Sequence, residues 1–147
     1  MIGISRRSIL VAAGILVVAA AALLFYRHMT GVPDDLDLAR AKLSEKGIYE
    51  VAIAPEAETI EQNALHSWVV TLSTPQGEMV DGAVIAVDGG MPQHRHGLPT
   101  APQMTEQLGQ GRYRIEGMKF SMSGWWELKF DISSALGSDR ATFNLVL

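Results

Sequence analysis

Cysteine is absent from this sequence of 147 residues. Its absence excludes disulfide bonds, thiolate zinc sites, iron–sulfur clusters and cysteine nucleophiles. The sequence also lacks a Gly-x-Ser-x-Gly nucleophile motif, a phosphate-binding glycine loop and a dinucleotide fingerprint. The carboxylates of Glu56, Glu58 and Glu61 are typical of a solvated acidic face rather than of a catalytic pair. We therefore expect no enzymatic activity.

Basic residues are scarce once the N-terminal segment is set aside. The chain has 12 lysines and arginines, and three of them, Arg6, Arg7 and Arg27, lie in that segment. The remaining 9 basic residues face 16 acidic ones, which gives the rest of the chain a net charge of −7. An acidic surface is poorly suited to phosphate backbones, so we expect no nucleic-acid partner.

Charged residues are missing from Ser8 to Tyr26, a mostly apolar run. Its length is close to the roughly 20 residues that cross a bilayer as a helix. Arg6 and Arg7 precede it, and a positive flank favours the cytoplasmic side. Residues 1–30 are therefore predicted to be a membrane anchor or signal, with residues 8–26 in the inner membrane, the N-terminus cytoplasmic and the C-terminal domain periplasmic.

Two interpretations of this N-terminal segment stay open. Ser5-Arg6-Arg7-Ser8 has the features of a twin-arginine export signal, and Ala20-Ala21-Ala22 offers small residues for cleavage. We favour an uncleaved anchor, because the apolar core of a cleavable signal is usually shorter. Both interpretations export the rest of the chain.

Residues 31–47 are predicted to form a linker and a short helix. Over Asp34 to Lys46, leucines recur near helical spacing, acidic residues lead, basic residues trail, and Gly47 follows as a natural stop.

From residue 48 to residue 147 the pattern changes to a period of two, with β-branched and aromatic residues in short runs between turn residues. In the run that begins at Trp125, for example, Trp126 and Leu128 fall on an apolar face while Glu127 and Lys129 fall on a polar one. We predict seven strands, over 48–54, 65–73, 83–88, 102–107, 112–118, 125–133 and 140–147. The predicted fold is all-β, an immunoglobulin-like antiparallel β-sandwich preceded by one transmembrane helix and a short helix.

The segment from Gly89 to Pro99 carries the most chemistry. His94 and His96 stand on alternate positions beside Met91, between glycines and prolines that oppose regular structure. In an extended segment, side chains two residues apart point the same way, so two imidazoles can reach one metal ion. Imidazoles suit copper, zinc or nickel, and a thioether favours cuprous copper, so copper is the predicted ion.

Other side chains extend this predicted copper site. Met122 lies in a second loop, before Gly124 and Trp125, that could approach the histidines. His66 and Met104 are weaker candidates, because strand residues of these types usually serve packing. A structural or partner-contact role for His94 and His96 remains the alternative to metal binding.

The sequence resembles the FixH/YtkA-like family of membrane-anchored periplasmic β-sandwich domains. The resemblance covers most of the chain after Gly47 and is carried by Met91-Pro92-x-His94-x-His96-Gly97, Gly111-x-Tyr113 and Met122-x-Gly124-x-Trp126. It implies a non-enzymatic protein associated with a copper-transporting ATPase and with assembly of a haem–copper respiratory oxidase. Some relatives are instead named as small-ligand, auxin-binding proteins.

We therefore expect a membrane-tethered periplasmic copper-binding protein that supports copper handling or oxidase assembly. The alternative is a metal-free protein-interaction or small-ligand module. A third possibility is stabilisation of a neighbouring membrane complex through the transmembrane helix.

Overall fold

The computed structural model describes residues 14–23 and 32–147. The chain divides into two compact units, residues 1–33 and residues 34–147. In the first unit, residues 14–23 form a short helix. Among the described residues, no helix is long and apolar enough to cross a membrane. The predicted span, residues 8–26, extends at both ends beyond the described helix, so its outer parts lie outside the described residues.

The second unit is built from β-strands, and residues 34–147 contain no α-helix. The strands are β1 (Ala41–Leu43), β2 (Glu50–Pro55), β3 (Leu65–Ser73), β4 (Val84–Met91), β5 (His96–Gly97), β6 (Gln103–Gly109), β7 (Arg112–Lys119), β8 (Trp125–Ser134) and β9 (Gly137–Val146). The seven predicted strands correspond to β2, β3, β4, β6, β7, β8 and β9, with ends that differ by up to three residues.

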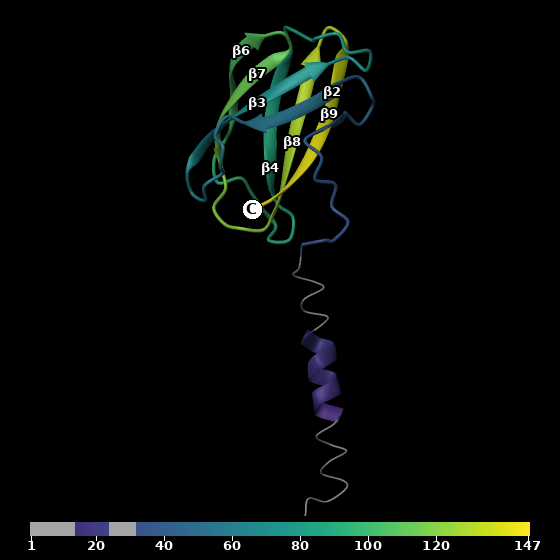
Figure 1. Ribbon diagram of the computed structural model, residues 1–147, viewed down its shortest axis with the longest axis vertical. Coiled ribbons are helices and arrows are strands. Elements are labelled where there is room, and N and C mark those ends of the chain that lie inside the picture. The colour runs from purple at the N-terminus through teal and green to yellow at the C-terminus, as the bar shows by residue number, and fades with distance from the viewer. Residues whose placement is uncertain (1–13, 24–31) are drawn as a thin grey trace, which may run out of the picture. The chain divides into compact units, whose positions relative to one another are not determined.

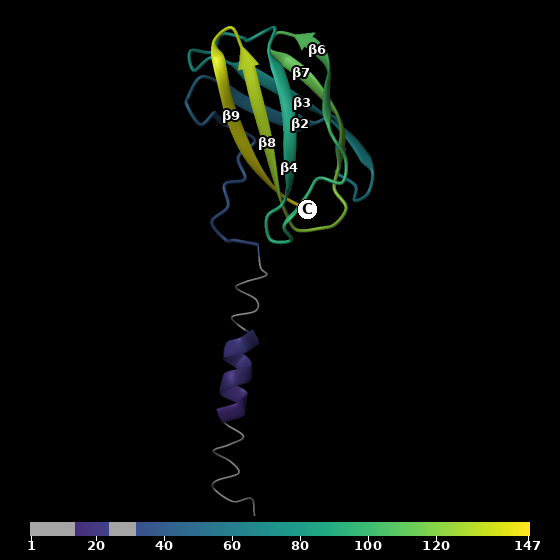
Figure 2. The same ribbon diagram turned by 180° about the vertical axis from the view of Figure 1, so that it is seen from behind.

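All strands belong to one antiparallel sheet, in the order β1-β2-β3-β7-β6-β4-β8-β9, with β5 paired to β4. Strands β4, β8 and β9 form one layer and β2, β3 and β7 form the layer that faces it (Figures 1 and 2). The layers are joined through β6, which meets β4 at one pair, Ala86 and Gln103. On the other side, the Glu45 amide donates a 2.8 Å hydrogen bond to the Arg140 carbonyl, beside β9. The predicted two-layer antiparallel architecture is thus a single, nearly closed, barrel-like sheet.

The core lies between the two layers and follows the predicted alternation. On β8, Trp126, Leu128, Phe130 and Ile132 are all buried. The same holds for Trp68, Val70 and Leu72 on β3, for Tyr113 and Ile115 on β7, and for Phe143 and Leu145 on β9. Burying each large apolar side chain stabilises the fold by about 1.5–3 kcal/mol, which makes this interior the main source of stability.

The short helix predicted over Asp34 to Lys46 is wrong. Residues 36–39 are irregular, and Ala41–Leu43 pair with β2 as strand β1. An Asp37 side-chain oxygen accepts a 2.9 Å hydrogen bond from the Ala39 amide, a local contact that competes with helical bonding. The Arg40 carbonyl accepts another hydrogen bond, at 2.8 Å, from the amide of Ile53 on β2. Pairing with a neighbouring strand therefore overrides the helical spacing of the leucines.

Candidate functional site

The histidine segment folds as a hairpin at the end of β4. Met91 pairs with His96 and Gly90 with Gly97, so residues 92–95 form its tip. The amides of His94 and Arg95 both donate to the Met91 carbonyl, at 3.1 and 2.9 Å. Arg95 has a φ of 56°, in the left-handed region. The expectation of an extended segment is therefore wrong: the turn that closes on the Met91 carbonyl folds it back.

The hairpin nevertheless brings the two imidazoles together. The ring centroids of His94 and His96 are 6.0 Å apart, and their planes make an angle of 25°. Both residues are exposed. Nδ1 of His96 lies 2.9 Å from the carbonyl oxygen of Gly97, which can only accept a hydrogen bond. This contact therefore places a hydrogen on Nδ1 and leaves the lone pair of Nε2 available in the neutral ring.

A buried tryptophan supports the hairpin from inside. The Trp126 ring meets the His96 ring edge-on, with centroids 5.8 Å apart, and meets Phe120 in the same way at 5.3 Å. Trp126 has no exposed surface, and its Nε1 donates a 3.0 Å hydrogen bond to the Met122 carbonyl. Trp126 thus connects the hairpin to the loop that carries Met122.

The two predicted methionine ligands occupy different environments. Met91 is 1% exposed and belongs to the core. Its Cε packs so tightly on Gly124 that a Cβ at that glycine would lie 3.0 Å from it. Met122 is 38% exposed and lines a hollow of about 130 Å³ together with Ile60, Gln62, Ser123 and Leu147. Neither histidine of the hairpin lines that hollow, so the structure does not bring Met122 and the histidines into one site.

The weaker candidates are packed into the domain. His66 is 7% exposed, and its Nε2 lies 2.8 Å from the Glu61 carbonyl oxygen. Its ring also contacts Phe120, with centroids 6.2 Å apart. Met104, on β6, is partly buried against the core. Both positions are those of packed structural side chains.

Ligands for a metal ion are limited in number. Across residues 14–23 and 32–147, no three side chains of His, Cys, Asp or Glu gather as a metal site would require. His94 and His96 therefore supply two imidazoles, and further donors must come from a thioether or from outside the domain. Two neutral imidazoles without a carboxylate suit copper better than magnesium or calcium, which take oxygen ligands.

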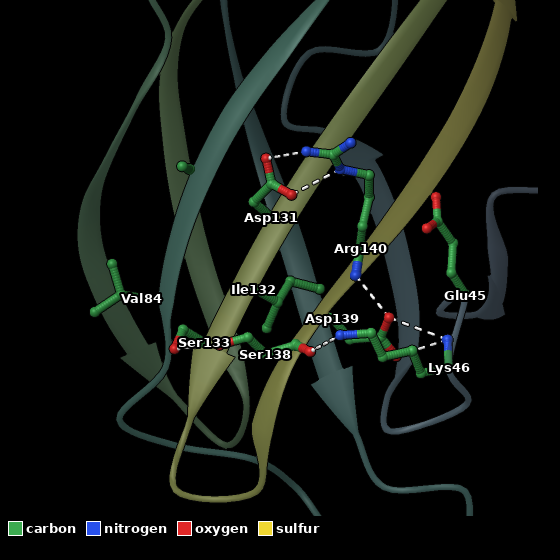
Figure 3. Close-up of a pocket in the computed structure, with 10 residues that line it drawn as sticks. Glu45, Lys46, Val84, Asp131, Ile132, Ser133, Ser138, Asp139 and Arg140 are labelled. Carbon is green, nitrogen blue, oxygen red and sulfur yellow. Dashed lines mark hydrogen bonds and ion pairs between the residues drawn. The ribbon is translucent and has the colours of Figure 1, made fainter.

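A hollow of about 440 Å³ lies at the opposite end of β4, β8 and β9 and holds a polar cluster (Figure 3). In it Asp139 is only 6% exposed, and its carboxylate accepts hydrogen bonds from the amides of Lys46, Ile48 and Arg140 at 2.8–3.2 Å. Arg140 in turn donates two hydrogen bonds to the Asp131 carboxylate, at 2.7 and 2.9 Å.

Burial alone would raise the pKa of Asp139, but hydrogen bonds from the Ser44 hydroxyl and from the three amides outweigh it and hold that pKa below its ordinary value. This saturated carboxylate joins the 44–48 turn to β9, so it serves the fold. The sequence alone did not identify it, because the amides of Lys46 and Ile48 come from residues 93 and 91 positions away.

Comparison with protein families matches residues 43–131 to the YtkA-like family. The matched segment holds β2 through β7, the histidine hairpin and most of β8. Among curated proteins, no match was found. The matched segment is more than half of the chain, and the chain therefore belongs to the YtkA-like family.

Proposed function

We propose that this YtkA-like domain binds copper at the tip of the β4–β5 hairpin, through His94 and His96. The observation that carries the proposal is the pair of exposed imidazoles with near-parallel rings 6.0 Å apart. Two imidazoles that bind one ion at about 2.0 Å have ring centroids roughly 5–6 Å apart, so the separation of the two rings fits one copper ion. The rings must turn out of their near-parallel stack to point one nitrogen each at that ion. The Gly97 carbonyl, which accepts from Nδ1 of His96, orients that ring as such partners do for metal-bound histidines.

Copper is the cargo in this proposal, and the exposed hairpin allows ligand exchange. His94 and His96 would hold the ion, and a partner's ligands would replace them one at a time. Met122 is the exposed thioether of the adjacent loop, and the hydrogen bond of Trp126 to its carbonyl ties that loop to the hairpin. A thioether donor would favour the cuprous state. Met91 could join only if the hairpin lifted from Gly124, because its side chain is buried there.

We further propose that the domain works on the periplasmic side of the inner membrane, with residues 8–26 as its anchor. The uncharged run over these residues and the preceding Arg6 and Arg7 support this placement. The resemblance to FixH supports a membrane partner that handles copper, either a copper-transporting ATPase or a haem–copper oxidase under assembly.

A metal-free interaction or small-ligand module is the second candidate. It is favoured by the lack of a third His, Cys, Asp or Glu ligand among the described residues. In this case the histidine hairpin would be a contact surface, shaped by the Trp126 ring beneath it.

A copper titration separates the two candidates. The full chain is titrated with cuprous and with cupric ions against a competitor of known affinity, and the titration is repeated with His94→Ala and His96→Ala combined. We expect one ion per wild-type chain and a loss of affinity of about 100-fold or more in the double variant. His28→Ala, which removes a histidine that precedes the domain, is the control and should leave the affinity unchanged. No uptake by the wild type, or equal uptake by the double variant, would refute copper binding at the hairpin.

A further inference from the structure

Beside His96 the surface is hollowed over a volume of about 320 Å³. Gly89, Gly90 and Gly97 line this hollow with backbone alone, and Arg95 and His96 lie at its margin. Two of these glycines, Gly89 and Gly90, are required by close strand contacts. A Cβ at Gly90 would lie 2.2 Å from the His96 carbonyl oxygen, and a Cβ at Gly89 would lie 2.3 Å from the Glu127 carbonyl oxygen. The hollow is therefore an opening beside the proposed copper ligand, and its volume suits a small molecule.

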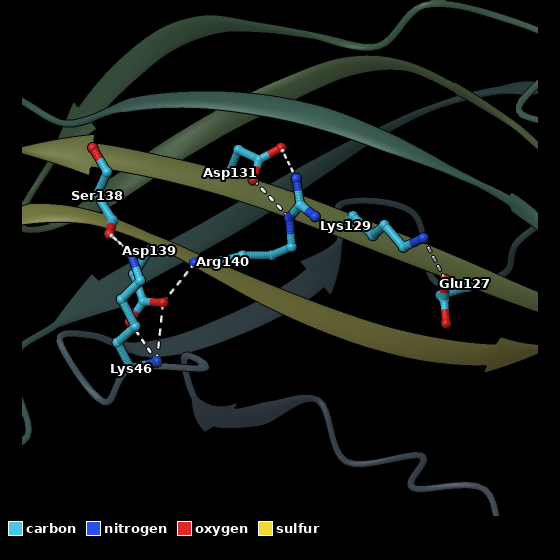
Figure 4. Close-up of polar contacts among 7 residues, drawn as sticks. All are labelled: Lys46, Glu127, Lys129, Asp131, Ser138, Asp139 and Arg140. Carbon is cyan, nitrogen blue, oxygen red and sulfur yellow. Dashed lines mark hydrogen bonds and ion pairs between the residues drawn. The ribbon is translucent and has the colours of Figure 1, made fainter.

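The charged groups around the hollow differ in whether they have partners. Lys129 is neutralised by Glu127, with Nζ 2.8 Å from Oε1, as Figure 4 shows. Asp88 accepts a 2.7 Å hydrogen bond from the Gly89 amide. The charge of Arg95, in contrast, is not neutralised: its guanidinium has no ion pair or hydrogen bond with any described residue. One free guanidinium therefore stands between the two imidazoles in sequence.

The backbone conformation at Arg95 also suggests that its side chain has a role outside the fold. Its φ of 56° lies in the left-handed region, where Gly and Asn are the residues that fit best. An arginine there costs stability, and its side chain makes no ion pair or hydrogen bond with the described residues. A guanidinium offers a planar fork of donors that matches the two oxygens of a carboxylate. Oxygen donors can also complete the coordination of copper, for which the hairpin supplies two imidazoles.

We propose that the hollow binds a small dicarboxylate, one carboxylate held by the Arg95 guanidinium and the other placed to complete the coordination of copper on His96. The inference rests on the proposed copper function and names the second molecule that this site takes. Copper would then be bound as a ternary complex with an organic acid. By linkage, copper and the acid must raise each other's affinity by the same factor.

The test measures copper affinity of the full chain with and without malonate, at fixed ionic strength. Free cupric ion is set by a competitor of known affinity, and the copper bound by malonate in solution is included in the calculation. We expect saturating malonate to tighten copper binding by about tenfold, equivalent to about 1.4 kcal/mol of coupling. Arg95→Asn removes the guanidinium and suits a positive φ, so the fold is kept. This variant should bind copper as the wild type does without malonate and should show less than a twofold effect of malonate.

Arg112→Gln is the matched control, because Arg112 is an exposed arginine on β7, away from the hairpin. It should keep the full malonate effect. A second arm follows malonate binding to the copper-free chain by NMR, with shifts expected at Gly89, Gly90 and His96 and lost in Arg95→Asn. If the wild type binds copper without any effect of malonate, or if Arg95→Asn keeps that effect, the inference is wrong and the copper function stands. If the wild type binds no copper, the proposed function fails, and shifts lost in Arg95→Asn would still support the carboxylate site.

Discussion

At one end of β4, β8 and β9 a buried carboxylate is saturated with hydrogen bonds, whereas at the other end two imidazoles are exposed and largely free. Asp139 is 6% exposed and takes three backbone amides, two of them from a turn distant in sequence. His94 and His96 stand on the β4–β5 hairpin, where Nδ1 of His96 contacts a backbone carbonyl oxygen. The Asp139 carboxylate, whose hydrogen bonds are satisfied within the domain, stabilises the fold, whereas the imidazoles, which keep lone pairs free, can bind a ligand. We therefore predict that substitutions at the Asp139 end change mainly stability, and that substitutions at the histidine end change mainly copper binding.

The largest expected effect is on stability, at Asp139. Asp139→Ala leaves the amides of Lys46 and Ile48 without their acceptor, and we expect it to lower the free energy of unfolding by about 3 kcal/mol. Urea unfolding followed by tryptophan fluorescence measures the change. Asp131→Ala, which breaks an exposed ion pair with Arg140, is the control and should cost less than about 1 kcal/mol. Copper affinity should be unchanged in both variants. A large loss of copper affinity in Asp139→Ala would show that copper binding depends on the Asp139 end of the domain.

The lowered pKa of the Asp139 carboxyl predicts that the protein loses stability in acid. Its pKa in the folded chain lies below the ordinary value, so its stabilisation is complete above the unfolded pKa of about 3.9 and is lost as pH falls through the folded pKa. The difference in unfolding free energy between wild type and Asp139→Asn should therefore be largest near neutral pH and should shrink below about pH 4. Urea titrations of both proteins across this range measure it. A difference that grows on acidification would contradict the assigned direction.

The next effect falls on the hairpin, through Gly90. A Cβ there would lie 2.2 Å from the His96 carbonyl oxygen, so Gly90→Ala must shift the strand that carries His96. We expect a loss of about 1–3 kcal/mol in stability together with weaker copper binding. Gly97→Ala is the matched control, since its Cβ would meet the Gly89 carbonyl oxygen at an ordinary 3.5 Å. If both alanine variants bind copper as the wild type does, His96 is not positioned by this strand pairing.

The smallest effect separates the two methionines. Met122→Leu removes an exposed thioether, and we expect a loss of about tenfold, or 1.4 kcal/mol, in cuprous affinity. Met91→Leu replaces a buried side chain by one of similar volume, so stability should change by less than about 1.5 kcal/mol and cuprous affinity by less than about threefold. Competitor titrations under reducing conditions measure both. The reverse ranking would mean that the hairpin lifts from Gly124 to expose Met91.

Sequence reasoning predicted the strands of residues 48–147 well and the segment before them poorly. The alternation around Trp126 and Leu128 identified β8 and its buried face, because one side of that strand is core and the other is solvent. The spacing of the leucines after Asp34 failed as a helix signal, because pairing of β1 with β2 decides that segment. Strand pairing of this kind depends on residues distant in sequence, and no local pattern contains it.

The candidate site was predictable in its residues and not in its geometry. His94 and His96 are neighbours as expected, yet through a hairpin that turns at Arg95 rather than through an extended segment. Met91 looked like a third ligand from its position beside the histidines, but it is the last residue of β4, pairs with His96 of β5 and has its side chain buried in the core. The exposure of each side chain, which the sequence does not specify for irregular segments, decides which candidates can reach an ion.

The most direct test of the central claim is the set of nitrogen ligands on bound copper. Pulsed electron paramagnetic resonance of the full chain with one equivalent of cupric ion counts the coordinated imidazoles. The account predicts two imidazoles in the wild type, one in His94→Ala and one in His96→Ala, and no change in His28→Ala. A spectrum with no imidazole nitrogen, or one that neither hairpin substitution alters, would contradict it.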